Sequence, residues 1–372
     1  MDNLRFVAPC LFGVEGIASG EFERMGANNV KAENGRVLFE GDYNMLARAN
    51  INSRFAERIC ICVGEFEADT FDKLFENVKK LEWENFIGKD DAFPVNGYSL
   101  NSALHSVPDC QAIIKKAIVE RLKSKYGISW FNESGCEVKI RFSILKNRVT
   151  VMIDTSGEGL HKRGYRRKSN DAPIKETLAA AICDTARIYP DTILYDPFCG
   201  SGTILIESAM MAMKMAPGLR RFFAAERFGF IPENVWREER SAAQDKILHN
   251  IDFRAFGSDN DPAAIKLAEE NAAKAGVSKY IKLQTADIRD FKAPDGRFVT
   301  VTNPPYGERL LDIKSAQALY KTMGEVFVQG QGKKYFVISP DEDFEKIFGR
   351  PADKRRKLYN GMIKCGLFMY FR

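Results

Sequence analysis

Residues 192–203, with the sequence TILYDPFCGSGT, decide the fold of the second half of this chain. The apolar run at 192–195 predicts a strand, and a helix is expected over 202–215, so a short loop joins strand directly to helix. Gly200 and Gly202 let that loop turn sharply and approach a ligand closely, and the helix N-terminus that follows offers unpaired N–H groups. The loop lacks the GxGxxG spacing of dinucleotide-binding folds and the lysine of a P-loop, which disfavours both of those sites.

Strands and helices keep alternating outward from this loop. Further strands are expected over 253–258, 281–285, 298–302 and 334–338, with a helix over 262–275 that Gly276 ends. The last two runs, 355–359 and 362–371, are predicted to form a hairpin with Asn360-Gly361 as its turn. This order predicts a doubly wound, Rossmann-like α/β domain whose mostly parallel sheet ends in an antiparallel hairpin.

Polar residues recur where successive strands end. Asp196, Asp259 and Asp287 each follow a predicted strand, and Asn303 follows another. A single aspartate in such a place is usually a cap or turn residue. Open α/β sheets bind their ligands at the carboxyl ends of the strands, where a carboxylate such as that of Asp259 can face ribose hydroxyls. Because these four residues all follow strands, they favour a cofactor site at the carboxyl edge of the sheet.

The Asn303-Pro304-Pro305-Tyr306 motif suits one kind of acceptor. The amide oxygen of Asn303 and the carbonyl of Pro304 can both accept hydrogen bonds from a planar NH₂ group. Proline fixes the local φ and cannot donate, and Tyr306 offers a flat face on which a heterocycle can stack. The motif could also simply end a strand in a turn.

The first half of the chain has a different organisation. Short strands and helices alternate over 4–63, and the pattern repeats over 70–154, with a hairpin across Lys146-Asn147. This predicts two small α+β units. The polar, basic stretch that follows, 156–171, reads as a linker.

Size and composition set wider limits. The 372 residues fit two or three domains, and the net charge of +5 is only mildly basic. A basic cluster at 161–168 that contains a tyrosine fits either a solvated face or a phosphate-binding surface. Eight cysteines without a CxxC pair and three scattered histidines make a structural metal site unexpected. The free thiols, and a sequence with no signal peptide or membrane-length apolar run, predict a cytoplasmic protein.

These motifs resemble the series of class I S-adenosylmethionine-dependent methyltransferases that act on exocyclic amino groups. The whole chain is similar to the family of large-subunit ribosomal RNA guanine-N2 methyltransferases, often labelled N6-adenine-specific DNA methylases. Members of that family carry a THUMP RNA-binding domain before the catalytic domain. The junction 154–166, DTSGEGLHKRGYR, carries the most specific part of the resemblance, and residues 172–179 resemble the helix that covers the methionine end of the cofactor. Some relatives carry a second methyltransferase domain, and this chain stops after the first, so a dual activity is not expected.

The resemblance implies the following organisation and site. A ferredoxin-like unit is expected over 1–65, THUMP over 66–155, a basic linker over 156–171 and the methyltransferase domain over 172–372. The catalytic residues would be Asn303, Pro304 and Tyr306. S-adenosylmethionine would be bound by Lys175, Thr177, Asp196, Phe198, Gly200, Gly202, Thr203, Asp259, Asp287 and Asn303. RNA would be contacted by Lys162, Arg163, Tyr165, Arg166 and Arg167.

Two alternatives stay open at this stage. A DNA adenine N6-methyltransferase would hold the same NH₂ geometry, but it needs a target-reading domain. Only about 65 residues follow Tyr306, and the last strands and helices of the sheet use them. The first half shows no helix-turn-helix or zinc-finger pattern, which favours RNA as the partner. The second alternative is a non-catalytic RNA-binding protein. The intact glycine loop and acceptor motif argue against it, because a protein without activity needs neither.

Overall fold

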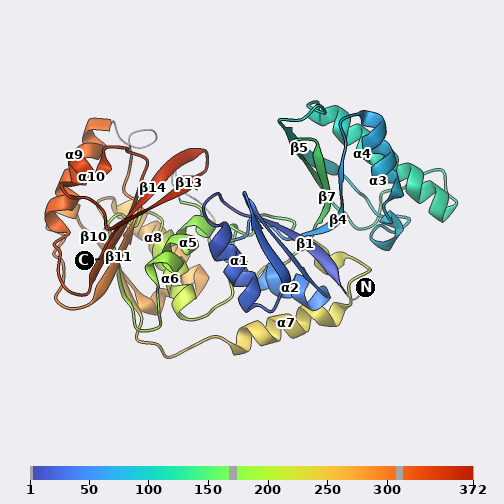
Figure 1. Cartoon of the computed structure of the whole chain (residues 1–372). Helices are drawn as coiled ribbons and strands as arrows, with labels where there is room; N and C mark the ends of the chain where they lie inside the picture. The colour runs from blue at the N-terminus through green and yellow to red at the C-terminus, as the bar shows by residue number, and fades with distance from the viewer. Residues whose placement is uncertain (1–2, 167–173, 307–312, 372) are drawn as a thin grey trace.

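The computed structural model describes residues 3–166, 174–306 and 313–371, and these form two seven-stranded sheets in separate lobes (Figure 1). The first sheet has the order β2-β3-β1-β4-β7-β6-β5. Its strands are β1 Leu4–Pro9, β2 Asn28–Glu33, β3 Arg36–Gly41, β4 Cys60–Glu67, β5 Val95–Leu100, β6 Ile140–Leu145 and β7 Arg148–Asp154. The helices that accompany it are α1 Glu15–Arg24, α2 Tyr43–Asn52, α3 Phe71–Lys80 and α4 Val107–Tyr126.

Strand β4 joins the two predicted N-terminal units into one sheet. Its first residues pair antiparallel with β1, as Phe6 opposite Ile61, and its whole length pairs with β7, from Cys60 opposite Asp154 onward. The boundary expected between residues 65 and 66 therefore falls inside a continuous strand. The two units share a backbone hydrogen-bond network, which ties the second unit to the first.

Local chemistry explains where several of these elements begin and end. The side chain of Asp42 accepts a hydrogen bond of 2.8 Å from the Met45 N–H and so caps α2. Gly127 ends α4 in the left-handed region, at φ 64°. Lys146 and Asn147 both have positive φ, as a tight two-residue turn between β6 and β7 requires, which confirms that predicted hairpin.

The second sheet has the order β10-β9-β8-β11-β12-β14-β13. Strands β8 to β12 run parallel, whereas β14 is antiparallel to β12 and to β13, so the predicted sheet with its antiparallel hairpin is confirmed. The strands are β8 Ile193–Asp196, β9 Arg254–Asp259, β10 Ile281–Thr285, β11 Phe298–Thr302, β12 Lys333–Ser339, β13 Lys354–Asn360 and β14 Ile363–Tyr370. The helices are α5 Glu176–Ala186, α6 Thr203–Ala212, α7 Glu233–Asp245, α8 Pro262–Ala275, α9 Ile313–Val326 and α10 Phe344–Phe348.

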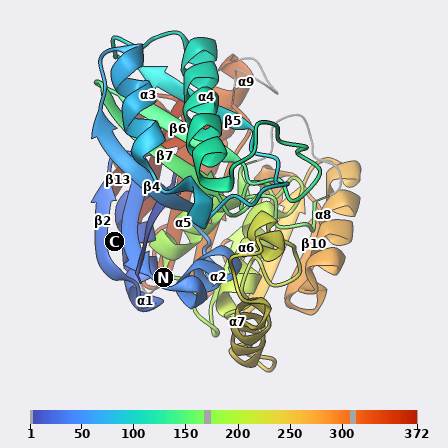
Figure 2. The ribbon, with the colours of Figure 1, turned by 90° about the vertical axis from the view of Figure 1, so that its right-hand side faces the viewer.

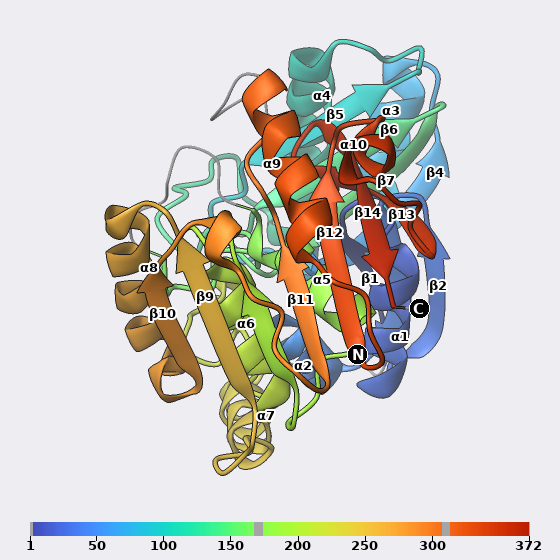
Figure 3. The same ribbon diagram turned by 90° about the vertical axis from the view of Figure 1, so that its left-hand side faces the viewer.

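Helices cover both faces of this sheet. On β12, Phe336 and Ile338 belong to the core shared with α5 and α6, whereas Tyr335 and Val337 belong to a second core with α9 and α10. This alternation follows from the two-residue period of a strand. Figure 3 shows α9 crossing in front of β11 and β12, with α5 and α6 behind the sheet.

Strand β2 and helix α7 were not among the predicted elements. Strand β2 is largely exposed and polar, so it shows no apolar alternation. Helix α7 is rich in charged residues and is buried only along one side. It lies beside α2 (Figure 2), where Arg48 and Glu239 form an ion pair of 2.7 Å. Because this contact is tertiary, the local sequence of α7 does not reveal it.

Candidate active site

The predicted strand-end residues gather around one cavity of about 330 Å³ at the carboxyl edge of the second sheet. A volume of this size lies within the range of small-molecule sites. The predicted residues that line it are Asp196, Phe198, Gly200, Thr203, Asp259, Asp287, Asn303, Pro304 and Tyr306. The shared register of loops that follow parallel strands brings them together.

The glycine loop forms one wall of the cavity. Gly200 and Gly202 both have positive φ, at 50° and 79°. The Gly200 N–H donates a hydrogen bond of 3.0 Å to Asp259 Oδ2, which links the ends of β8 and β9. Gly202 itself does not line the cavity, and a Cβ there would lie 3.1 Å from that of Ala268 in α8. Gly202 therefore shapes the loop through its packing on a helix.

Asp196 is a buried carboxyl at the floor of the cavity. It is 1% exposed and accepts hydrogen bonds from Thr302 Oγ1 at 2.7 Å and from the Phe198 N–H at 3.2 Å. Burial, together with the nearby charge of Asp259, raises the pKa of Asp196 to about 7, against the opposing effect of these hydrogen bonds. The residue joins β8 to the last residue of β11, directly before the acceptor motif.

The two other carboxylates have different surroundings. Asp259 Oδ1 accepts a hydrogen bond of 3.1 Å from the Asp261 N–H, and Asp261, not Asp259, caps α8. Asp287 accepts from the side chain and the backbone of Arg289, and these contacts lower the pKa of Asp287 to about 2. Asp259 Oδ2 accepts from the Gly200 N–H and Oδ1 from the Asp261 N–H. Because a carboxylate oxygen has two lone pairs, each of them can accept a further hydrogen bond.

The acceptor motif presents an unused acceptor. Among the described residues, Asn303 Oδ1 is buried and has no hydrogen-bond partner. An unpaired buried amide oxygen is costly, and a ligand in the cavity that donates a hydrogen bond would satisfy it. Tyr306, 6% exposed, lines the same cavity, and its hydroxyl accepts a hydrogen bond of 2.6 Å from Asn360 Nδ2. Gly307, which follows the motif, lies outside the described residues.

Lys175 and Thr177 do not line the cavity, and both contact the first lobe. Thr177 Oγ1 donates to Glu57 Oε1 at 2.6 Å, and Lys175 Nζ lies 3.2 Å from Glu57 Oε2. Glu57 precedes β4 in the first lobe, and His161 Nδ1 is a third partner at 3.3 Å. Lys175 and Thr177 thus join the start of α5 to the N-terminal unit. Their neighbour Ile174 lines the cavity.

The predicted RNA-contacting cluster divides into buried and exposed residues. The Arg163 side chain is 2% exposed and donates to the Leu160 and Arg54 carbonyls, and the Tyr165 hydroxyl donates to Glu207 at 3.0 Å. The prediction that Arg163 and Tyr165 contact RNA is therefore wrong, because their polar groups are buried and hydrogen-bonded inside the protein. Lys162 is exposed, with a 3.2 Å ion pair to Glu158.

Arg166 points toward the cofactor loop. Its Nη2 donates to Thr203 Oγ1 at 2.5 Å and to the Ile174 carbonyl at 3.2 Å, and only 14% of its side chain is exposed. A role in RNA contact is not supported by this placement. Arg167 lies outside the described residues.

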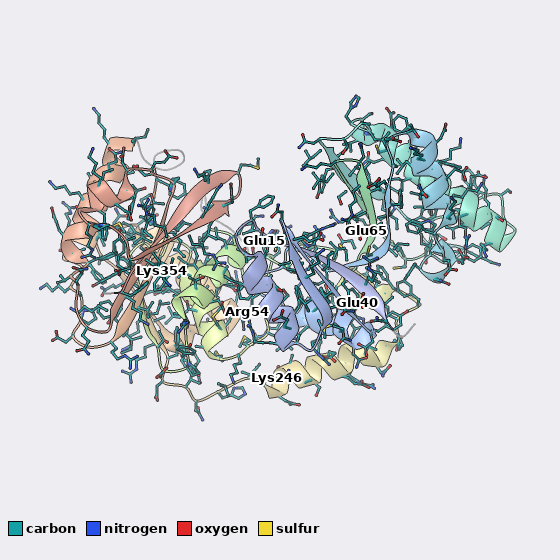
Figure 4. The ribbon with its side chains drawn as sticks, in the orientation of Figure 1. Glu15, Glu40, Arg54, Glu65, Lys246 and Lys354 are labelled. Atoms are coloured by element: carbon teal, nitrogen blue, oxygen red, sulfur yellow. The ribbon has the colours of Figure 1, made fainter. Side chains whose placement is uncertain are left out.

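The junction between the lobes is a buried ionic network that sequence reasoning missed. Arg54, labelled in Figure 4 between α1 and α6, donates to the Met210 and Met215 carbonyls at 3.2 and 2.6 Å. Glu21 accepts from Ser53 Oγ and the Arg54 N–H, and Glu207 lies 3.6 Å from Arg163 Nε. Isolated charges in otherwise apolar helices, such as Glu207 in α6, were the one available signal.

The cavity fits S-adenosylmethionine. The backbone of the glycine loop can come close to a bound cofactor, and Asp259 offers a carboxylate for ribose hydroxyls. The apolar walls that could hold a heterocycle are formed by Phe198, Ile204, Ala264 and Ile288. In the described part of the chain there is no cluster of side chains that could hold a metal ion. Nor is any helix there long and apolar enough to cross a membrane.

Comparisons with known families agree with this geometry. Residues 163–368 match the model of the RMKL-like methyltransferase domain, which covers more than half of the chain. The chain belongs to this family. Residues 5–60 match the ferredoxin-like domain named RlmL first domain, and residues 68–154 match the THUMP domain.

Individual relatives extend over the whole chain. YpsC of Bacillus subtilis, provisionally named an RNA methyltransferase, is 41% identical over 100% of this chain and 97% of its own length. The ribosomal RNA large subunit methyltransferase K/L of Cellvibrio japonicus is 32% identical over 98% of this chain but only 51% of its own length. This chain thus spans about half of that relative.

Two solved structures share the fold. The protein SMU.472, provisionally described as a methyltransferase and solved with S-adenosylhomocysteine, superposes with a TM-score of 0.94 at 41% identity, covering 100% of this chain and 98% of the other. A Listeria monocytogenes protein, described as a predicted N6-adenine-specific DNA methylase, superposes with a TM-score of 0.93 at 44% identity. The match covers 99% of this chain and 96% of the other. The RMKL-like domain is a class I methyltransferase with S-adenosylmethionine as its cofactor, which confirms the fold and cofactor predictions.

Proposed function

We propose that this protein methylates an exocyclic amino group of a base in RNA, and that the target is guanine N2 in large-subunit ribosomal RNA. The single observation that carries the amino-group assignment is the buried, unpaired Asn303 Oδ1 on the wall of the cofactor cavity. The THUMP match supports RNA as the partner. The choice of ribosomal RNA rests on the name of the K/L relatives.

The residues of the site then have separate tasks. When bound, S-adenosylmethionine supplies a methyl group already activated on a sulfonium. Asp259, the glycine loop and Asp287 hold the cofactor, while Asn303 Oδ1 and the Pro304 carbonyl accept hydrogen bonds from the amine and orient its nitrogen. Such orientation can supply several kcal/mol, on the order of 7–11 at best. Tyr306 stacks on the base after it leaves its helix.

The test is methyl transfer from tritiated S-adenosylmethionine to ribosomal RNA and, in parallel, to duplex DNA. We expect label in the RNA alone, and nucleoside mass spectrometry of ribosomal RNA from a deletion strain should lack one N2-methylguanosine. Label in the DNA would instead establish the N6-adenine alternative. Absence of cofactor binding by calorimetry would establish the non-catalytic one.

The assignment to Asn303 has its own test. Asn303→Ala should lower the transfer rate by at least about 100-fold while the affinity for S-adenosylhomocysteine changes little, because the lost group faces the acceptor. Asn234→Ala, on the exposed face of α7, is the matched control. Unchanged turnover in Asn303→Ala contradicts the proposed role.

A further inference from the structure

The closing hairpin of the second sheet uses a different turn from the one its sequence suggests. Asn360 is the last residue of β13 and pairs with Ile363, so the two turn residues are Gly361 and Met362. Gly361 has φ 67° and stands at the first turn position, where glycine is favoured. The prediction of Asn360-Gly361 as the turn is wrong by one residue. The amide of Asn360 is consequently not needed by the turn.

That amide reaches the acceptor motif. Asn360 Nδ2 donates a hydrogen bond of 2.6 Å to the hydroxyl of Tyr306, and the two residues are only 3% and 6% exposed. Strand β14 pairs with β12 only as far as Gly366 opposite Ser339, so residues 363–365 and the turn extend beyond the carboxyl edge of the sheet. The hairpin therefore overhangs the edge at which the cavity lies.

The hairpin is held firmly from the first lobe. Arg356 Nε donates to the Gly13 carbonyl at 3.1 Å, and a Cβ on Gly13 would lie 2.4 Å from the Lys357 carbonyl oxygen. Glu15, labelled in Figure 4, accepts from the Gly13 N–H at 2.8 Å and so fixes that loop. The phenyl ring of Phe12 also meets Tyr359 edge to face, with 5.9 Å between the ring centroids. A donor on such a support stays in place when substrate binds.

We propose that Asn360 is a positioning residue for methyl transfer, which holds the hydroxyl end of Tyr306 and so fixes the direction of the ring beside the acceptor base. This inference rests on the proposed function, since it concerns the same acceptor. The hydroxyl oxygen lies on the Cβ–Cγ axis of the ring, so the hydrogen bond fixes where the tip of the ring points, and its removal takes away this anchor. A small loss of alignment at a reacting group lowers the rate of the chemical step while cofactor binding is unaffected.

A double-mutant cycle tests the proposal. Tyr306→Phe removes the hydroxyl but keeps the ring, and Asn360→Leu removes the donor but keeps the volume. Each should lower kcat/KM for the RNA about three- to tenfold, the range that the net strength of one hydrogen bond gives. The affinity for S-adenosylhomocysteine, measured by calorimetry, should stay within about twofold of wild type. The double variant should be no slower than the slower single one, because both changes remove the same interaction.

Three results would overturn the proposal. These are a wild-type rate in Tyr306→Phe, a wild-type rate in Asn360→Leu, or losses that multiply in the double variant. Tyr306→Phe leaves the hairpin intact, so the test stands even if Asn360→Leu folds poorly. Lys364→Ala, an exposed residue of β14 with an ion pair of 3.5 Å to Glu342, is the control for the hairpin. If duplex DNA proves to be the acceptor, the proposed function fails, and the same ratios measured on DNA still decide the role of Asn360.

Discussion

Thr177 donates a hydrogen bond of 2.6 Å to Glu57 across the boundary between the two lobes, from the first turn of α5 to the segment before β4. Glu57 also faces Lys175 and His161, at 3.2 and 3.3 Å. Burial alone would raise its pKa, but the neighbouring His161, the hydrogen bond from Thr177 and the charge of Lys175 lower the pKa of Glu57 to about 2. Glu57 is thus one of the residues that join the two lobes, and Lys175, one of its partners, is next to Ile174 on the wall of the cavity.

Replacing Glu57 should weaken that contact in a pH-dependent way. Because its folded pKa lies below the ordinary value of 4.5, the contribution of Glu57 is fully present above pH 4.5 and is lost as pH falls toward 2. Glu57→Gln should therefore lower the free energy of unfolding at pH 7, by roughly 3 kcal/mol if the whole shift is lost. Urea unfolding at pH 7 and at pH 3 measures this. An equal deficit at both values would show that the charge is not responsible.

Asp196 should have the opposite pH dependence. Its folded pKa, about 7, lies above the ordinary value of 3.8, so the folded state holds a proton that the unfolded state releases between these values. The contribution of Asp196 to the free energy of unfolding should therefore fall as pH rises from about 4 to 7. Asp196→Asn keeps the acceptor for Thr302 and should lack this decline. Asp191→Asn, an exposed aspartate before the same strand, should behave like the wild type. Parallel curves for all three proteins would contradict the assignment.

The sequence predicted the site better than its surroundings. The glycine loop, Asp259, Asp287 and Asn303 lie around one cavity, as predicted, because strand ends fix their register and that register is a local property. The contacts of Lys175, Thr177, Arg163 and Tyr165 could not be predicted, because each side chain has a partner remote in sequence: Glu57 for the first two, Arg54 for Arg163 and Glu207 for Tyr165. A basic run has the same sequence pattern whether it faces phosphate or a buried carboxylate.

Gly202 offers a test of the cofactor loop. A side chain there meets two costs, the positive φ of 79° and the 3.1 Å approach to Ala268. Gly202→Ala should lose about 1–2 kcal/mol from the backbone alone and should weaken S-adenosylhomocysteine binding at least several-fold. Gly296→Ala is the matched control, because Gly296 has φ 87° but open space around it. It should share the loss of stability and keep the affinity, as calorimetry of both variants would reveal. Weakened binding in both variants would rule out the crowding at Ala268 as the cause.

Arg163 and Lys162 are adjacent basic residues for which the structure predicts different effects. Arg163→Met leaves the Leu160 and Arg54 carbonyls without their donor and removes the cation beside Glu207, which should cost roughly 3–5 kcal/mol. Lys162→Ala removes only an exposed ion pair, worth at most about 1 kcal/mol. If Lys162 faces phosphate, its loss should also reduce the slope of log affinity for RNA against log salt by about 1. Thermal unfolding separates the two stability effects, and filter binding at several salt concentrations measures the slope. A stable Arg163→Met protein with a reduced slope would restore the RNA contact that its burial excludes.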